Sequence, residues 1–220
     1  DARSVVRVDA AVPLDVAASL GCAVITGVGS VLNSAKVAPG DAVAVIGLGG
    51  VGLSAVMGAA LAAAGTVVAI DVNPAKLELA RTLGATHAFD ARDASLVPDV
   101  LGLTGGGVDF AFDMAGVATS TAQGYSLLRR GGSLVVAALP HSSTVLELPI
   151  ASMVSDGRRV IGSYMGDSDP LRDIPRLAAL YAAGRPPIDR LQSARLPLDD
   201  INEGFDRLRT GNAVRDVVVL

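Results

Sequence analysis

The chain has 220 residues, of which 50% are hydrophobic and 18% are charged, and its formal net charge is −4. This length suits one or two domains, and the composition excludes a disordered chain. The charges are scattered and the apolar stretches are interrupted, so we expect neither a nucleic acid nor a membrane as a partner. The single cysteine, Cys22, excludes an internal disulfide and favours a reducing, cytoplasmic location.

Short apolar runs alternate with helical segments between residues 41 and 164. Such alternation indicates right-handed crossovers and an α/β fold, a doubly wound parallel sheet with helices on both faces. We predict strands at 41–47, 66–71, 86–90, 133–140 and 158–164 and within 104–116, and helices at 50–64, 73–85, 93–103 and 119–132.

The two ends of the chain differ from this repeat. Residues 1–40 do not continue it clearly, and residues 165–220 predict a helix at 170–184, a helix at 198–211 and a strand at 214–220. The starting residue is Asp1 rather than Met, so we expect a part of a longer protein.

A glycine-rich loop joins the first predicted strand to the first helix. Residues 47–52 read GLGGVG, a G-x-G-x-x-G pattern in the strand-to-helix position that dinucleotide binding requires. Gly47 permits the tight turn, Gly49 lets the backbone approach a pyrophosphate, and Gly52 lets the helix pack against the strand. The backbone N–H groups near Gly50 and Val51 then face the phosphates. The alternative is a glycine turn that serves packing alone.

The second predicted strand ends in an acidic residue, Asp71. In a dinucleotide-binding fold a carboxylate at this point accepts the hydroxyls of the adenosine ribose and repels a 2′-phosphate, which favours NAD over NADP. Asp71 could instead cap the helix at 73–85, and the two roles are compatible. Asn73 is the predicted N-cap of that helix and Pro74 its first residue. Lys76 lies one turn later, within reach of the same ribose or as an ordinary surface lysine.

The chain resembles the zinc-dependent medium-chain alcohol dehydrogenases, most closely their class III-like branch. The resemblance depends on the block GCAVITGVGSVLNSAKVAPGDAVAVIGLGGVGLSAVMGA at 21–59 and on INEGFDRLRTG at 201–211. It implies that Cys22 is a catalytic residue and a ligand of the catalytic zinc, and that Thr26 lies against the nicotinamide. It also implies that Val136 contacts the nicotinamide carboxamide through its backbone and that Arg215 reaches the pyrophosphate.

Each of these residues could instead have a purely structural role. A lone cysteine is usually a small buried hydrophobic residue. Thr26 alone would be a helix or turn residue, and Arg215 alone a strand charge. His87 and His141 match no ligand position.

The resemblance also implies a division of the chain. Residues 1–22 are expected to be a remnant of a catalytic GroES-like domain, 23–164 the Rossmann domain, and 165–220 a segment that returns to the catalytic domain. The other zinc ligands of the family belong to sequence that precedes this region, so we expect zinc in an intact protein and not in this chain.

The predicted function is therefore the coenzyme-binding part of an NAD-dependent, zinc-type alcohol dehydrogenase. Intact enzymes of this kind transfer hydride between NAD and an alcohol, an aldehyde or a thiol–aldehyde adduct, with zinc lowering the pKa of the alcohol. We expect the isolated chain to bind NAD(H) without catalysis and to form a homodimer through 158–164. The alternatives are a stand-alone NAD-binding regulatory module and a zinc-independent reductase of the same superfamily.

Overall fold

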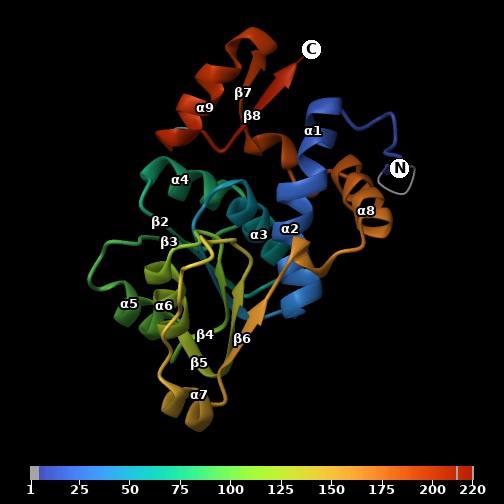
Figure 1. Ribbon diagram of the computed structural model, residues 1–220. Helices are drawn as coiled ribbons and strands as arrows, with labels where there is room; N and C mark the ends of the chain where they lie inside the picture. The colour runs from blue at the N-terminus through green and yellow to red at the C-terminus, as the bar shows by residue number, and fades with distance from the viewer. Residues whose placement is uncertain (1–4, 212, 220) are drawn as a thin grey trace.

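A computed structural model describes residues 5–211 and 213–219 of the chain. Its centre is a six-stranded parallel sheet with the strand order β3-β2-β1-β4-β5-β6 (Figure 1). This is the doubly wound order of dinucleotide-binding folds, so the predicted fold class is confirmed. The strands are β1 Ala42–Ile46, β2 Thr66–Asp71, β3 His87–Asp90, β4 Val108–Asp113, β5 Leu128–Val136 and β6 Arg159–Gly162.

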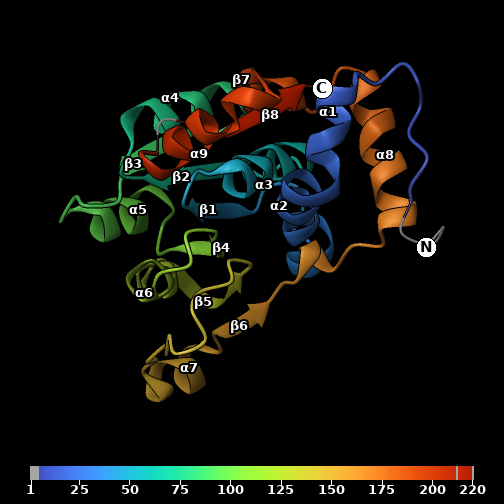
Figure 2. The same ribbon diagram turned by 45° about the horizontal axis from the view of Figure 1, so that its top comes forward.

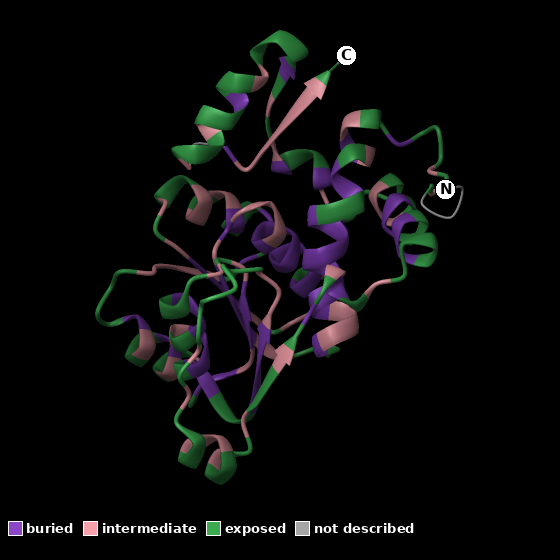
Figure 3. Ribbon diagram, viewed as in Figure 1, coloured by how far each residue is buried: buried purple, intermediate pink, exposed green. Residues whose placement is uncertain are grey.

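Helices cover both faces of this sheet because alternate strand residues point to opposite sides. Val43 and Val45 of β1 face a core that includes residues of α3, whereas Ala44 and Ile46 face a second core that includes residues of α5 and α6. The central strands are largely buried (Figure 3). Burial on both faces explains why their residues are almost wholly apolar. The helices that cover the sheet are α3 Gly50–Leu61, α4 Pro74–Thr82, α5 Leu96–Leu103 and α6 Ala118–Ser126.

A long helix that was not predicted runs from Leu14 to Ala35 and packs beside α3 (Figure 1). It consists of α1 Leu14–Ser19, the π-helical turn η2 Leu20–Val24, α2 Ile25–Gly29 and a second π-helical turn, η3 Ser30–Ala35. By length and composition this helix could cross a membrane, but 67% of its apolar window is buried inside the fold, as in a core helix. The predicted domain boundary between residues 22 and 23 falls inside it, and the division into three parts stays a prediction.

The helix fits against α3 because small residues line the contact. A Cβ atom on Gly27 would lie 2.2 Å from the carbonyl oxygen of Val51, so a larger residue would push the two helices apart. This close approach places the start of α3 beside the middle of the long helix.

The C-terminal part adds a second, two-stranded parallel sheet above α3 and α4 (Figures 1 and 2). The Asn73 side chain donates a hydrogen bond to the carbonyl of Gly211 at 3.1 Å, and Arg195 pairs with Asp15. The first contact ties the segment before the last strand to the start of the helix at Pro74–Thr82, and the second ties β7 to α1. The elements here are α8 Pro170–Ala182, β7 Gln192–Pro197, α9 Ile201–Arg209 and β8 Arg215–Val219.

The predicted helix at 119–132 is wrong in its second half. α6 ends at Ser126, and the glycine pair at 131–132 lies inside β5. The strand begins early because Leu128 pairs with Val108 of β4, after which a register shift accommodates the glycines. The helix α7, Ile150–Asp156, was not predicted.

Candidate cofactor-binding site

The glycine loop turns sharply between β1 and α3. Gly47 has a φ of 88°, a conformation that side chains disfavour. A Cβ atom on Gly52 would lie 1.8 Å from the carbonyl oxygen of Gly47, so only glycine permits this helix–strand contact. A Cβ atom on Gly49 would meet nothing within 4 Å, which leaves open space over the loop.

The N-terminus of α3 is available to an anion. Gly49 is its N-cap, and among the described residues no side chain caps it, so backbone N–H groups near Gly50 and Val51 point outward. Arg215 of β8 lies directly above: a Cβ atom on Gly50 would be 2.7 Å from its Nε. That Nε is buried and has no hydrogen-bond partner. A cation, a helix N-terminus and an orphaned donor together fit a pyrophosphate.

Asp71 stands at the carboxyl end of β2, next to the same loop. Its Oδ2 accepts a hydrogen bond from the Leu48 N–H at 2.6 Å, and its Oδ1 accepts one from the Asn73 N–H at 2.9 Å. The carboxylate therefore supports the loop while it retains further acceptor positions for ribose hydroxyls. Asn73 also caps α4 as predicted, since its side chain accepts from the Ala75 N–H.

A cavity of about 370 Å³ opens beside Asp71 at the carboxyl ends of the strands. It lies where β1 adjoins both β2 and β4, the point at which ligands bind in doubly wound sheets. Lys76, half-buried in the first turn of α4, is not among its lining residues. The lining comprises Ile46, Gly47, Ile70, Asp71, Val72, Ala91, Arg92, Ala115, Val117, Thr119, Ser120 and Gln123.

The far wall of this cavity depends on Asp113, which sequence reasoning missed. Asp113 ends β4, is fully buried, and accepts hydrogen bonds from Ser120 Oγ at 2.9 Å and Thr121 Oγ1 at 2.5 Å. It also accepts from the backbone N–H of Ala115 and Gly116. It thereby fixes the turn from β4 into α6 that lines the cavity. The sequence signal for this role was its position at a strand end, six residues before a Thr-Ser-Thr run.

The residues assigned to the nicotinamide end lie on the long helix and at the ends of β5 and β6. Cys22 is exposed and lines a cavity of about 210 Å³ together with Arg215. Thr26 is buried, and its hydroxyl lies 3.8 Å from the sulfur of Met165, a neighbour that sequence reasoning missed. Val136 is half-buried at the end of β5 and pairs with Gly162 of β6.

Zinc does not fit the part of the chain that the structure describes. No group of three His, Cys, Asp or Glu side chains suited to a metal occurs in 5–211 or 213–219. His87 bonds to Thr86 and His141 to Ser143.

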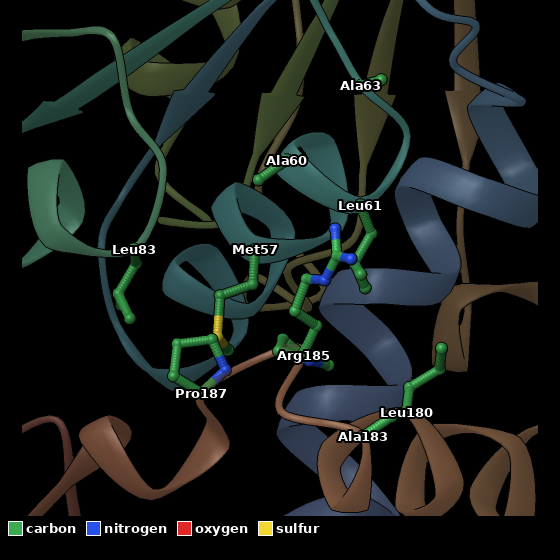
Figure 4. A pocket seen from close by; sticks show the side chains of 10 residues that line it. Met57, Ala60, Leu61, Ala63, Leu83, Leu180, Ala183, Arg185 and Pro187 are labelled. Carbon is green, nitrogen blue, oxygen red and sulfur yellow. The ribbon is translucent and has the colours of Figure 1, made fainter.

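A larger cavity of about 450 Å³ lies away from the glycine loop, at the C-terminal end of α3 (Figure 4). Its walls are apolar side chains such as Met57 and Leu180, with Arg185 as the one cation among its lining residues. Its described lining lacks the converging backbone donors that the glycine loop provides.

Comparison with known proteins identifies the family. Residues 50–183 match the family model of the zinc-binding dehydrogenases. The chain belongs to this family. The chain is 37% identical to an alcohol dehydrogenase zinc-binding domain protein from Burkholderia ambifaria, with a TM-score of 0.95 over 98% of this chain and 58% of that one. It is 31% identical to benzyl alcohol dehydrogenase from Acinetobacter calcoaceticus, with a TM-score of 0.94 over 97% of this chain and 59% of that one.

A third solved structure adds information on the cofactor. The chain is 28% identical to a zinc-binding dehydrogenase from Sinorhizobium meliloti bound to NADP, with a TM-score of 0.82 over 90% of this chain and 58% of that one. The chain thus spans less than two thirds of the length of these relatives. The resemblance to medium-chain alcohol dehydrogenases, and to a family of enzymes, is confirmed. The class III-like assignment stays a prediction.

Proposed function

We propose that this chain is the coenzyme-binding part of an NAD-dependent, zinc-type alcohol dehydrogenase and that it binds NAD(H) by itself. The observation that carries the proposal is the buried, unpartnered Nε of Arg215 above Gly50 at the uncapped start of α3. Buried donors in folded proteins are nearly always paired, so an unpaired one beside a helix N-terminus marks the place of an anion.

Each end of the dinucleotide has a place in this proposal. The pyrophosphate lies against the loop and Arg215, and the adenosine lies in the cavity beside Asp71. The nicotinamide lies toward Thr26 and the end of β5 near Val136. When bound, the cofactor would supply the hydride acceptor for alcohol oxidation. In this proposal the glycine loop, Asp71 and Arg215 orient the cofactor.

We propose further that alcohol oxidation requires ligands beyond those described here. A catalytic zinc needs three protein ligands and an open position, and Cys22 supplies one thiolate. We therefore expect the isolated chain to bind NADH and not to oxidise simple alcohols.

Fluorescence titration of NADH against the purified chain tests the proposal. We expect saturable binding that Asp71→Ala weakens, because the ribose loses a carboxylate acceptor. Asp99→Ala, which removes an exposed carboxylate on α5, is the matched control and should bind like the unmodified chain. No NADH binding at millimolar concentration, or equal affinities for Asp71→Ala and the unmodified chain, would overturn the proposal.

We also propose that the chain forms a homodimer through β6. This strand is one edge of the sheet, and Val160 at its centre is 39% exposed. An exposed strand edge pairs readily with another chain. Sedimentation should find a dimer for the unmodified chain and a monomer for Val160→Pro, because proline removes a backbone donor. A stable monomer of the unmodified chain at micromolar concentration would refute this assignment.

A further inference from the structure

Arg92 brings a positive charge to the adenosine end of the proposed site. It follows β3 in the loop that borders the cavity, and it is the one cation among the described residues that line the cavity. Its Nη2 donates a hydrogen bond to the carbonyl of Val72 at 3.1 Å, so the guanidinium lies beside the residue that follows Asp71 at the end of β2. In dinucleotide-binding folds an arginine near this position binds the 2′-phosphate of NADP.

Asp90 holds that arginine in a two-pronged contact. Arg92 Nε donates to Asp90 Oδ1 at 2.9 Å, and Arg92 Nη2 donates to Asp90 Oδ2 at 2.6 Å. The backbone N–H of Arg92 also donates to Oδ1 at 2.9 Å. Bidentate pairs of this type fix the orientation of the guanidinium as well as its position. The hydrogen bond from the Arg92 side chain lowers the pKa of Asp90 to about 2, so the carboxylate is ionised at neutral pH.

The sheet places the two acidic residues side by side. Asp71 and Asp90 are partners in the register of β2 and β3, each at the carboxyl end of its strand. A 2′-phosphate that entered here would meet the carboxylate of Asp71 and an arginine whose charge is already offset by Asp90. A ribose with free hydroxyls would meet the carboxylate of Asp71 as a hydrogen-bond acceptor, without the charge repulsion that a 2′-phosphate experiences.

We propose that Asp90 is a positioning residue that sets the choice between NAD and NADP by withholding Arg92 from the 2′-phosphate. The inference rests on the proposed function, because it takes the cavity beside Asp71 as the adenosine site. It predicts that replacing Asp71 alone does not give the chain a high affinity for NADPH. Loss of Asp90 in addition frees the guanidinium, and NADPH binding then improves through Arg92.

The test measures the dissociation constants of NADH and NADPH for four variants and the unmodified chain. From Asp71→Ala to the double variant Asp71→Ala/Asp90→Asn, we expect NADPH affinity to rise about 10-fold or more, the effect of one charge-assisted contact. The triple variant that adds Arg92→Gln should lose this gain. Asp71→Ala/Asp90→Glu keeps a carboxylate for Arg92 and should remain close to Asp71→Ala.

A matched control removes the same charge from a neighbouring position. Asp93 follows Arg92 and bonds to Ser95 instead, so Asp71→Ala/Asp93→Asn should bind NADPH like Asp71→Ala. Binding of 2′,5′-ADP compared with ADP reports the 2′-phosphate contact separately from the nicotinamide. The inference is overturned if Asp90→Asn gives no gain in the Asp71→Ala background, or if the gain persists without Arg92. If the unmodified chain binds neither NADH nor NADPH, the proposed function fails first and the inference falls with it.

Discussion

Replacement of Arg215 by methionine should affect the free chain and the cofactor complex in opposite directions. In the free chain the Nε of Arg215 is buried without a hydrogen-bond partner. An unsatisfied buried donor costs about 1–3 kcal/mol, and methionine keeps most of the apolar stem. We therefore expect the free energy of unfolding of the free chain to stay the same or to rise by up to about 2 kcal/mol.

Cofactor binding should weaken in the same variant. A hydrogen bond from a guanidinium to a phosphate contributes about 1.5–3 kcal/mol. Its loss corresponds to a dissociation constant for NADH that is about 10- to 150-fold higher. The stabilisation that saturating NADH gives to the fold should shrink accordingly, because this linkage depends on the ratio of ligand concentration to dissociation constant.

Urea unfolding with and without NADH, together with calorimetric titration, measures both effects. Arg209→Met is the matched control, because Arg209 is 77% exposed and pairs with Asp206 on α9. It changes the net charge equally and should leave both quantities unchanged. The reasoning would be refuted if Arg215→Met bound NADH as tightly as the unmodified chain, or if it destabilised the free chain by several kcal/mol.

Three further predictions concern stability. Gly52→Ala should lower the free energy of unfolding by about 1–3 kcal/mol and weaken NADH binding, because the added Cβ would clash with the carbonyl oxygen of Gly47. The control Gly102→Ala on α5 has open space around the new Cβ and should leave the free energy of unfolding unchanged or raise it slightly. Asp113→Asn should lower the free energy of unfolding, measured in urea, by about 1–3 kcal/mol, because an amide N–H₂ would face hydroxyl and backbone donors. The hydrogen bond from the Arg92 side chain lowers the pKa of Asp90 to about 2. The contribution of Asp90 to the stability of the fold is therefore present above the usual carboxyl pKa and is lost as the pH falls toward 2. The stability difference between the unmodified chain and Asp90→Asn should therefore narrow between about pH 4 and pH 2, and a difference that does not change with pH would contradict this.

The sheet and its glycine loop were predictable because their local patterns are unambiguous. The strands β1 and β2 are apolar throughout, which is typical of a sheet buried on both faces. Asn73 and Pro74 marked the start of α4 with the side-chain cap that the structure contains. In each case the signal lies within a few residues and does not depend on distant contacts.

The long helix from Leu14 to Ala35 was missed for a physical reason. It is covered on several sides by α3, α8 and the β6 connection, so its apolar residues do not form one stripe with helical spacing. The strand β7 was missed because QSARLP lacks the β-branched residues of a buried strand. The contacts of Thr26 with Met165 and of Arg92 with Val72 depend on the tertiary fold, and sequence spacing does not report them.

The buried unpaired donors of the described residues differ in how the fold accommodates them. Three buried side-chain nitrogen atoms of the described residues lack a hydrogen-bond partner, and they belong to Arg158, Gln192 and Arg215. The Arg158 guanidinium lies over the Tyr125 ring at 5.3 Å and its Nε lies 3.6 Å from an Asp156 oxygen, so its charge is accounted for within the fold. Gln192 is the register partner of Arg215 across β7 and β8, so the other two orphaned atoms belong to adjacent residues. Two unpaired donors on neighbouring strands, one of them above an uncapped helix N-terminus, therefore support the proposed pyrophosphate position.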